Sequence, residues 1–162
     1  MKKLGILLFA LMIGFAAEAQ INPHALGLRL GGGDAGGSEI SYQHGLSRKT
    51  RLEADLGWRN SKYYDAFCLT GVHQWVFPIE SGFQWFVGVG GQFGSWSWDD
   101  KYYNGNDDDG MWIAIAGQIG IEYQFSEVPL QIGIDARPNI GVVNSNSELG
   151  NWDVALSIRY CF

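Results

Sequence analysis

The chain has 162 residues, a formal net charge of −6 and 23 glycines against 4 prolines. An acidic balance of this kind disfavours nucleic acid as a partner. No long helical period and no stretch apolar enough for a membrane helix follow the first twenty residues, and the length suits one domain.

The first residues have the pattern of a secretory signal peptide. Lys2 and Lys3 form a basic region, Leu4–Ala17 is apolar but too short to span a bilayer as a helix, and Ala17-Glu18-Ala19 places small residues where signal peptidase reads. We predict a leader over residues 1–19, cleaved before Gln20, and one domain over residues 20–162. An uncleaved anchoring helix is the alternative.

Eight segments alternate apolar and polar residues, as half-buried strands do. The clearest is Thr50–Asn60, where Leu52, Leu56 and Trp58 alternate with charged residues. The predicted strands are Ala25–Gly33, Ser38–Leu46, Thr50–Asn60, Tyr64–Phe77, Phe83–Ser95, Met111–Phe125, Leu130–Pro138 and Trp152–Phe162.

The connections between these segments also alternate. The connections after the second, fourth and sixth strands are tight, and the one after the fourth strand is Pro78–Gly82. The connections after the third, fifth and seventh strands are mostly longer. Membrane barrels have short turns at one end and longer loops at the other, with both termini beside the short turns. The first long-end connection, Asp34–Gly37, is shorter than this pattern suggests.

One face of the strands is apolar and bulky, and the other is small or charged. The charged face carries Arg29, Glu39, Arg51, Glu53, Asp55, Arg59, Glu122, Asp135, Arg137, Asp153 and Arg159. A soluble barrel of the lipocalin kind would place the bulky face inside, but an eight-stranded interior is only just wide enough for side chains. We therefore predict an all-β, eight-stranded, antiparallel up-and-down transmembrane β-barrel, with the charges paired in its lumen.

Aromatic residues gather at the predicted strand ends, as in the interfacial girdles of membrane barrels. One girdle contains Trp75, Phe77, Phe83, Trp85, Tyr123, Phe125, Tyr160 and Phe162, and the other contains Trp58 and Trp152.

Cys68 and Cys161 are the only cysteines. Export permits a disulfide, but the strand assignment puts the two residues across the barrel and at different depths. We expect two separate, inward-facing thiols.

The leader, the eight strands, the charged lumen and the ending Tyr160-Cys161-Phe162 resemble the small OmpA/OmpX-like outer-membrane β-barrels of Gram-negative bacteria. The resemblance implies an outer-membrane location, both termini in the periplasm, contact with lipid and lipopolysaccharide, and a monomer. It also implies that the barrel-assembly machinery reads the last strand, through Val154, Leu156, Ile158, Tyr160 and Phe162. Lipid-facing packing alone also explains those residues.

The third long-end connection is chemically distinctive. Trp96, Trp98, Tyr102 and Tyr103 could form a recognition surface, as exposed aromatics do at interfaces, or extend the outer girdle. Five aspartates, Asp99, Asp100, Asp107, Asp108 and Asp109, are a weak candidate site for Ca²⁺, because their spacing is not that of an EF-hand. A solvated acidic tip is the simpler interpretation.

We expect a structural or surface-interaction role, without cofactor or catalysis. A minimal pore for water or small ions is one alternative, although the lumen of so small a barrel is filled by side chains. A lipid A-modifying enzyme is another, since some small outer-membrane barrels use a His–Ser pair. The predicted strand assignment places neither His44 nor His73 beside a serine, which disfavours it.

Overall fold

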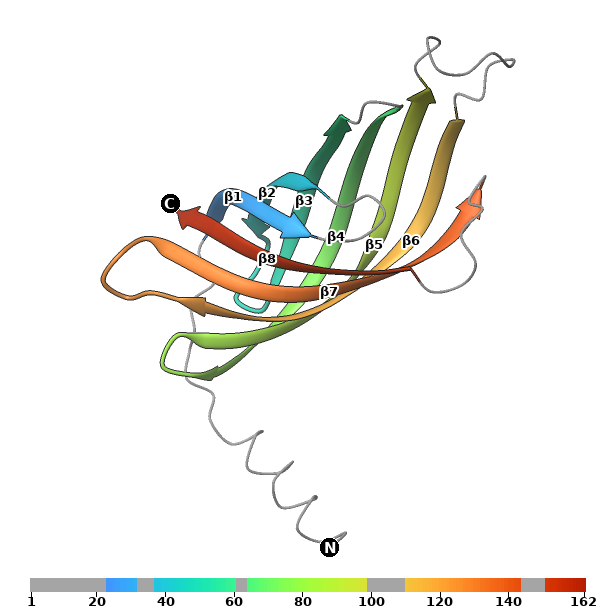
Figure 1. Ribbon diagram of the computed structural model, residues 1–162. Helices are drawn as coiled ribbons and strands as arrows, with labels where there is room; N and C mark the ends of the chain where they lie inside the picture. Colours follow the sequence, from blue (N-terminus) through green and yellow to red (C-terminus); the bar gives the residue numbers. More distant parts are fainter. Residues whose placement is uncertain (1–22, 32–36, 61–63, 99–109, 144–150) are drawn as a thin grey trace, which may run out of the picture.

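Eight antiparallel strands close into one barrel. The protein is represented by a computed structural model that describes residues 23–31, 37–60, 64–98, 110–143 and 151–162. The strands are β1 (His24–Gly31), β2 (Ser38–Gly45), β3 (Thr50–Asn60), β4 (Tyr64–Glu80), β5 (Phe83–Trp98), β6 (Gly110–Gln124), β7 (Leu130–Val143) and β8 (Asn151–Cys161). Each strand pairs with its neighbours in sequence, and β8 pairs with β1 (Figure 1). The predicted up-and-down topology is confirmed.

Burial alternates along the strands, so that polar side chains point inward and apolar ones outward. On β1, Arg29 is completely buried while its neighbour Leu28 is 44% exposed. The largest fully buried side chains are mostly arginine, glutamine and glutamate, which is the reverse of a soluble protein core. The predicted orientation of the two faces is confirmed. In the described part of the chain, no helix is both long enough and apolar enough to traverse a bilayer.

The turns β2–β3, β4–β5 and β6–β7 lie together at one end of the barrel, which we call the tight-turn end. The β4–β5 turn consists of Ser81 and Gly82, with φ angles of 47° and 91°, as a two-residue type I′ hairpin requires. The two chain ends meet here too, because the Phe162 amide donates to the His24 carbonyl at 2.9 Å. At the opposite end, which we call the loop end, residues 32–36, 61–63, 99–109 and 144–150 lie outside the described residues.

The predicted C-terminal ends of two strands are wrong, because the prediction stopped each strand at a proline. β4 continues through Pro78 to Glu80, and its register with β5 shifts between those two residues. β7 continues through Pro138 to Val143, and its pairing with β6 is interrupted at Gly117 and Gln118, beside that proline. A proline lacks an N–H and is therefore tolerated where a bulge or a gap leaves the ladder without a bond. Of the fourteen remaining ends, six agree with the prediction and eight differ by one to three residues.

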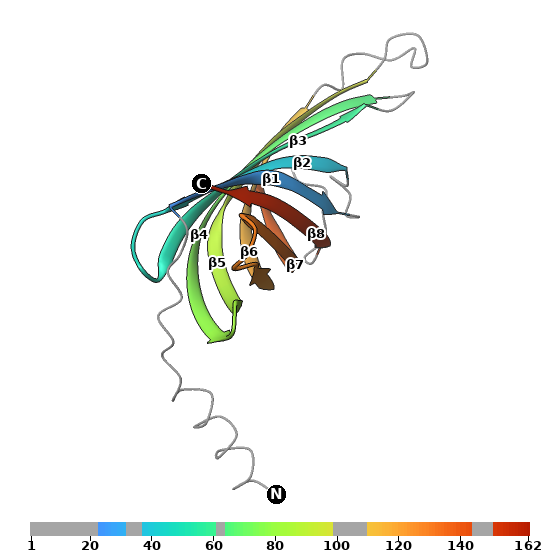
Figure 2. The ribbon, with the colours of Figure 1, turned by 90° about the vertical axis from the view of Figure 1, so that its left-hand side faces the viewer.

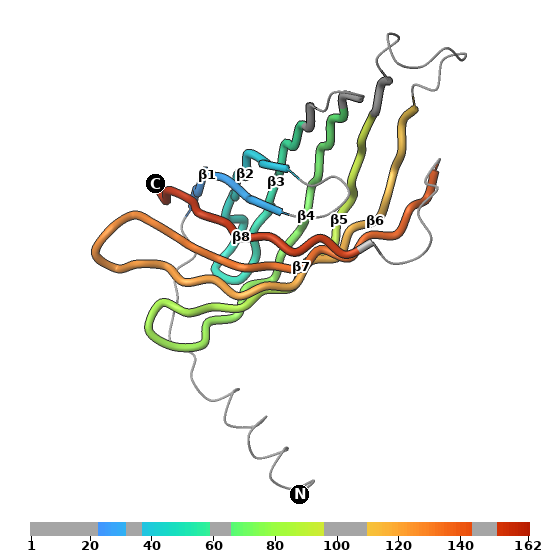
Figure 3. Tube along the Cα trace, in the orientation of Figure 1, coloured from blue at the N-terminus to red at the C-terminus, as the bar shows by residue number. Residues whose placement is uncertain are grey.

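The wall is not of equal height all round. At the loop end, the pairing of β2 with β3 stops at Gly57, whereas β3 and β4 stay paired to Asn60. β4 and β5 are paired to Trp98. Figures 1 and 2 show β3–β6 rising beyond the ends of β1 and β2, and the trace in Figure 3 follows the same extension. These strands form a raised sheet at the loop end.

Candidate functional site

Arg29 of β1 connects its own strand to three others inside the barrel. Its guanidinium lies 2.7 Å from Asp135 of β7, 3.1 Å from Glu39 of β2 and 2.6 Å from Asp153 of β8. Arg29 and Glu39 face each other across the β1–β2 pairing, so the strand register brings them together. Asp153 is the least buried of the four, with 19% of its side chain exposed.

A second cluster lies around Arg137 of β7. Its guanidinium contacts Glu39 and Glu53, each at 3.2 Å, and also Asp55. Arg159 of β8 reaches the other oxygen of Glu53 at 2.9 Å. Glu39 joins this cluster to Arg29, so one continuous set of ion pairs connects β1, β2, β3, β7 and β8.

A third contact joins β3 to β6. The two terminal nitrogens of Arg51 donate to the two carboxylate oxygens of Glu122, at 2.5 and 2.8 Å. The guanidinium also lies 4.9 Å from the centre of the Phe86 ring, within cation–π range. Gln74 accepts from Arg51 Nε and donates to Gln118.

The arginines of these ion pairs are buried inside the barrel. None of Arg29, Arg51, Arg137 and Arg159 is more than 2% exposed. A charge buried to this degree is costly unless a partner compensates it, and each of the four contacts at least one carboxylate. Chemically, the set can hold strands at fixed distances and obstruct passage.

A few buried polar atoms lack a hydrogen-bond partner among the described residues. They are Asp55 Oδ1, Arg137 Nε and the side-chain oxygens of Gln84, Gln92 and Gln131. Buried polar atoms without a protein partner are usual sites for internal water. They all belong to inward positions, so any water they bind lies in the lumen.

Several predicted site residues lie at or beyond the limit of the described structure. Arg59 belongs to β3, and Trp96 and Trp98 belong to β5, but their side chains are outside the described residues. Tyr102, Tyr103, Asp99, Asp100, Asp107, Asp108 and Asp109 are outside them entirely. Where the structure does describe side chains, no group of three or more His, Cys, Asp or Glu could hold a metal ion.

The last strand presents its apolar residues outward. Val154, Leu156, Ile158, Tyr160 and Phe162 are between 48% and 62% exposed. β8 is hydrogen-bonded to β7 on one side and to β1 on the other, which makes it the strand that closes the barrel.

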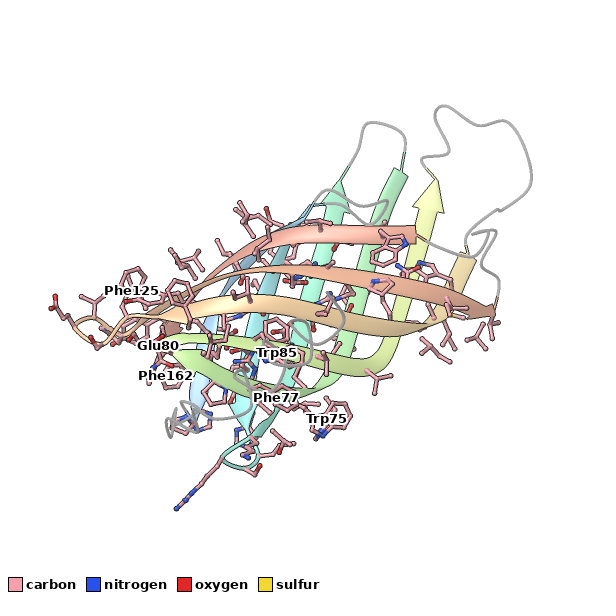
Figure 4. The ribbon with its side chains drawn as sticks, turned by 90° about the horizontal axis from the view of Figure 1, so that it is seen from below. Trp75, Phe77, Glu80, Trp85, Phe125 and Phe162 are labelled. Atoms are coloured by element: carbon pink, nitrogen blue, oxygen red, sulfur yellow. The ribbon has the colours of Figure 1, made fainter. Side chains whose placement is uncertain are left out.

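Aromatic rings surround the tight-turn end. Phe77 stacks on Trp85 with ring centres 4.5 Å apart, and Tyr123 contacts both Phe83 and Phe125. In Figure 4, Trp75, Phe77 and Trp85 project from the outer side of β4 and β5. At the loop end, Trp58 and Trp152 are exposed.

Cys68 and Cys161 are both buried and are not joined by a disulfide, as predicted. The Cys68 sulfur lies 3.1 Å from the Gln92 amide nitrogen and 3.7 Å from the Thr70 hydroxyl.

One group of residues at the tight-turn end is not evident from the sequence. His24, Tyr42 and His44 meet on the outer face of β1 and β2. The sequence places His24 just before the predicted first strand, and alternation alone cannot set the register between two strands. His44 and His73 both lie opposite Leu52 of β3, so the predicted absence of a serine opposite them is confirmed.

No protein-family model and no curated protein matches the chain. Solved structures do. The N-terminal β-barrel domain of OprF from Pseudomonas aeruginosa is similar with a TM-score of 0.70 at 13% identity, over 86% of this chain and 96% of that one. The chain has the fold of the small outer-membrane β-barrels.

Two further structures agree with this fold. Neisserial surface protein A (NspA) matches with a TM-score of 0.57 at 14% identity, over 86% of this chain and 94% of its own. Ail, the attachment invasion locus protein of Yersinia pestis, matches with a TM-score of 0.55 at 13% identity, over 86% and 96%. The predicted structural resemblance is therefore confirmed. At these low sequence identities, the resemblance concerns the fold alone.

Proposed function

We propose that this protein is an integral, closed β-barrel of the outer membrane that serves as a scaffold for a surface-interaction region at its loop end. The observation that carries the proposal is the reversed burial. Arg29 and Glu53 are inaccessible to solvent while Leu156 is 62% exposed. Such a wall is stable where the outside is hydrocarbon, and a closed barrel satisfies every strand edge there.

The proposal includes a route to the membrane. Residues 1–19 would direct export, and the barrel-assembly machinery would read Val154, Leu156, Ile158, Tyr160 and Phe162 on β8. The tight-turn end and both termini would then face the periplasm. The outer face would contact phospholipid and lipopolysaccharide, and the protein would be a monomer.

The raised sheet of β3–β6 supports a role at the cell surface. Trp96 and Trp98 belong to β5, one of the strands of this sheet, and Tyr102 and Tyr103 follow β5 in the sequence. Ail is an attachment protein by name, and we extend that kind of role to this chain as a proposal. The buried arginines of the lumen favour this role over a pore.

Membrane fractionation and gel mobility test the location. We expect the protein to sediment with outer membranes, and the unheated protein to migrate differently from the heated one because a detergent-resistant barrel stays compact. Recovery in the periplasmic soluble fraction would refute the proposal.

Loop replacement tests the surface role. Exchanging residues 99–109 for a Gly-Ser segment of equal length should abolish binding of whole cells to host proteins or surfaces, while heat-modifiable mobility is retained. Exchanging Asp34–Gly37 instead is the control and should leave binding intact. Binding that survives the first exchange would refute a role for the third loop.

A further inference from the structure

Two histidines face each other across the first hairpin. His24 of β1 is the direct partner of His44 of β2 in the antiparallel register. Their Nδ1 atoms are 3.3 Å apart, and their ring centres are 5.0 Å apart. The two imidazoles therefore direct the same kind of nitrogen at a common point.

Tyr42 adds an oxygen at that point. It lies two residues before His44 and so shares the outer face of β2. Its hydroxyl is 2.8 Å from His24 Nδ1, the same nitrogen that faces His44. Two further potential ligand atoms, the Tyr42 hydroxyl oxygen and His44 Nδ1, thus lie within 3.3 Å of His24 Nδ1.

The group lies at the rim of the tight-turn end, because His24 is the first residue of β1 and His44 is the last but one of β2. His44 and Tyr42 are exposed, and His24 is half-buried. Phe162 of β8 covers the other side of His24, with ring centres 5.6 Å apart. An ion could reach the group without entering the lumen, and its ligands are held by a hydrogen-bonded ladder on β1 and β2.

We propose that His24, His44 and Tyr42 bind one divalent late first-row transition-metal ion, Zn²⁺ or Cu²⁺. Two nitrogens 2.0–2.1 Å from a tetrahedral ion lie roughly 3.3 Å apart, which is the separation found here. Imidazole nitrogen suits Zn²⁺ and Cu²⁺, whereas Mg²⁺ and Ca²⁺ prefer oxygen ligands. With two histidines as the only nitrogen ligands, the Tyr42 oxygen and water complete the coordination.

Binding would cross-link β1 to β2, next to the pair of strands that closes the barrel. The alternative is a hydrogen-bonded aromatic cluster with no affinity for metal. The two differ in what titration with an ion does, and the chain supplies its own control. His73 is the third histidine and also faces outward, but its neighbours across β3 and β5 are Leu52 and Val89.

The experiment is calorimetric titration of the protein, purified from membranes in detergent without a histidine tag, with Zn²⁺, Cu²⁺ and Mg²⁺ separately. We expect one Zn²⁺ or Cu²⁺ per chain and no binding of Mg²⁺. His24→Ala and His44→Ala should each weaken binding by about 100-fold or more, because they remove a direct ligand rather than a supporting residue. Tyr42→Phe should weaken it by about tenfold, and His73→Ala should leave it unchanged.

Unfolding gives a second readout. Zn²⁺ should raise the urea midpoint of the wild type and of His73→Ala, and should leave that of His44→Ala unchanged. Heat-modifiable mobility shows whether each alanine variant folds. If one does not, His44→Gln is used in its place, because glutamine is close to histidine in volume. Absence of binding to the wild type, or binding that persists in both the His24 and His44 variants, would overturn the proposal.

Discussion

Gly90 and Gly91 of β5 lie on opposite faces of the wall. The space around them differs. A Cβ on Gly90 would overlap the backbone of Gly71 and Val72 on β4. A Cβ on Gly91 would meet no atom closer than the Ala114 carbonyl, at 4.0 Å. Close approach of the backbones therefore requires glycine at position 90 and not at position 91.

This difference predicts opposite effects of one methyl group. Gly90→Ala should lower the free energy of unfolding by about 1–3 kcal/mol, because the strands must separate to admit it. Gly91→Ala should leave it unchanged or raise it by up to about 1 kcal/mol, because alanine restricts the unfolded chain. Urea unfolding in detergent measures both. Equal losses in the two variants would contradict the close approach.

Single residues also show how far the sequence alone leads. The direction of Arg29 or Glu53 follows from alternation, because in a strand the side chain of every second residue lies on the same face. The meeting of His24 with His44 does not follow from it, because it depends on which residues pair across β1 and β2. Faces are local properties of a strand, whereas partners are properties of the register.

At the scale of the strands, the ion pairs act as ties between elements that are distant in sequence. Arg51 of β3 and Glu122 of β6 lie across the lumen, and Arg137 of β7 reaches Glu53 of β3. The set of inward charges could be predicted from alternation, but these pairings could not, because they depend on the curvature of the closed wall. The sequence also did not predict that β4 and β7 continue beyond Pro78 and Pro138. The bulge and the gap that accommodate these prolines depend on how each strand pairs with its neighbour.

The Arg51–Glu122 pair allows this tie to be measured. Arg51→Met alone should lower the free energy of unfolding by about 3–5 kcal/mol, because it leaves the Glu122 carboxylate buried without a counter-charge. The double variant Arg51→Met/Glu122→Leu should recover most of that loss, while Gln74 keeps its bond to Gln118. Denaturant titration of the wild type, both single variants and the double variant gives the coupling. Losses that simply add would show that the two groups do not interact.

At the scale of the whole molecule, the outer face determines the solvent in which the barrel is stable. This much could be predicted from the sequence, because an eight-stranded lumen is too narrow for the bulky rings and the small or charged face must fill it. The structure bears this out, with Ile119 in the middle of the β6 outer face at 50% exposure.

Placing a charge on that face tests whether it meets hydrocarbon. Ile119→Arg should lower the free energy of unfolding in lipid vesicles by about 2–4 kcal/mol, as for a charge near the bilayer midplane. Val128→Arg, in the β6–β7 turn and similarly exposed, should cost about 0–1 kcal/mol. Similar costs at the two positions would mean that the depth of the barrel in the bilayer has been misassigned.

The lumen should behave as a packed interior, with conductance as its measure. Arg137 contacts Glu39, Glu53 and Asp55 from across the barrel, so we expect its side chain to obstruct any passage through the lumen. We expect no resolved current steps for the wild type in planar bilayers.

Two double variants test this expectation. Arg137→Ser/Asp55→Ser removes one charge of each sign and the bulk between them, and should admit small ions. Arg48→Ser/Glu127→Ser removes the same charges from exposed turns and should stay silent. Current steps of equal size in the wild type and both double variants would show that Arg137 and Asp55 do not close the lumen, because removing an obstruction should increase the current.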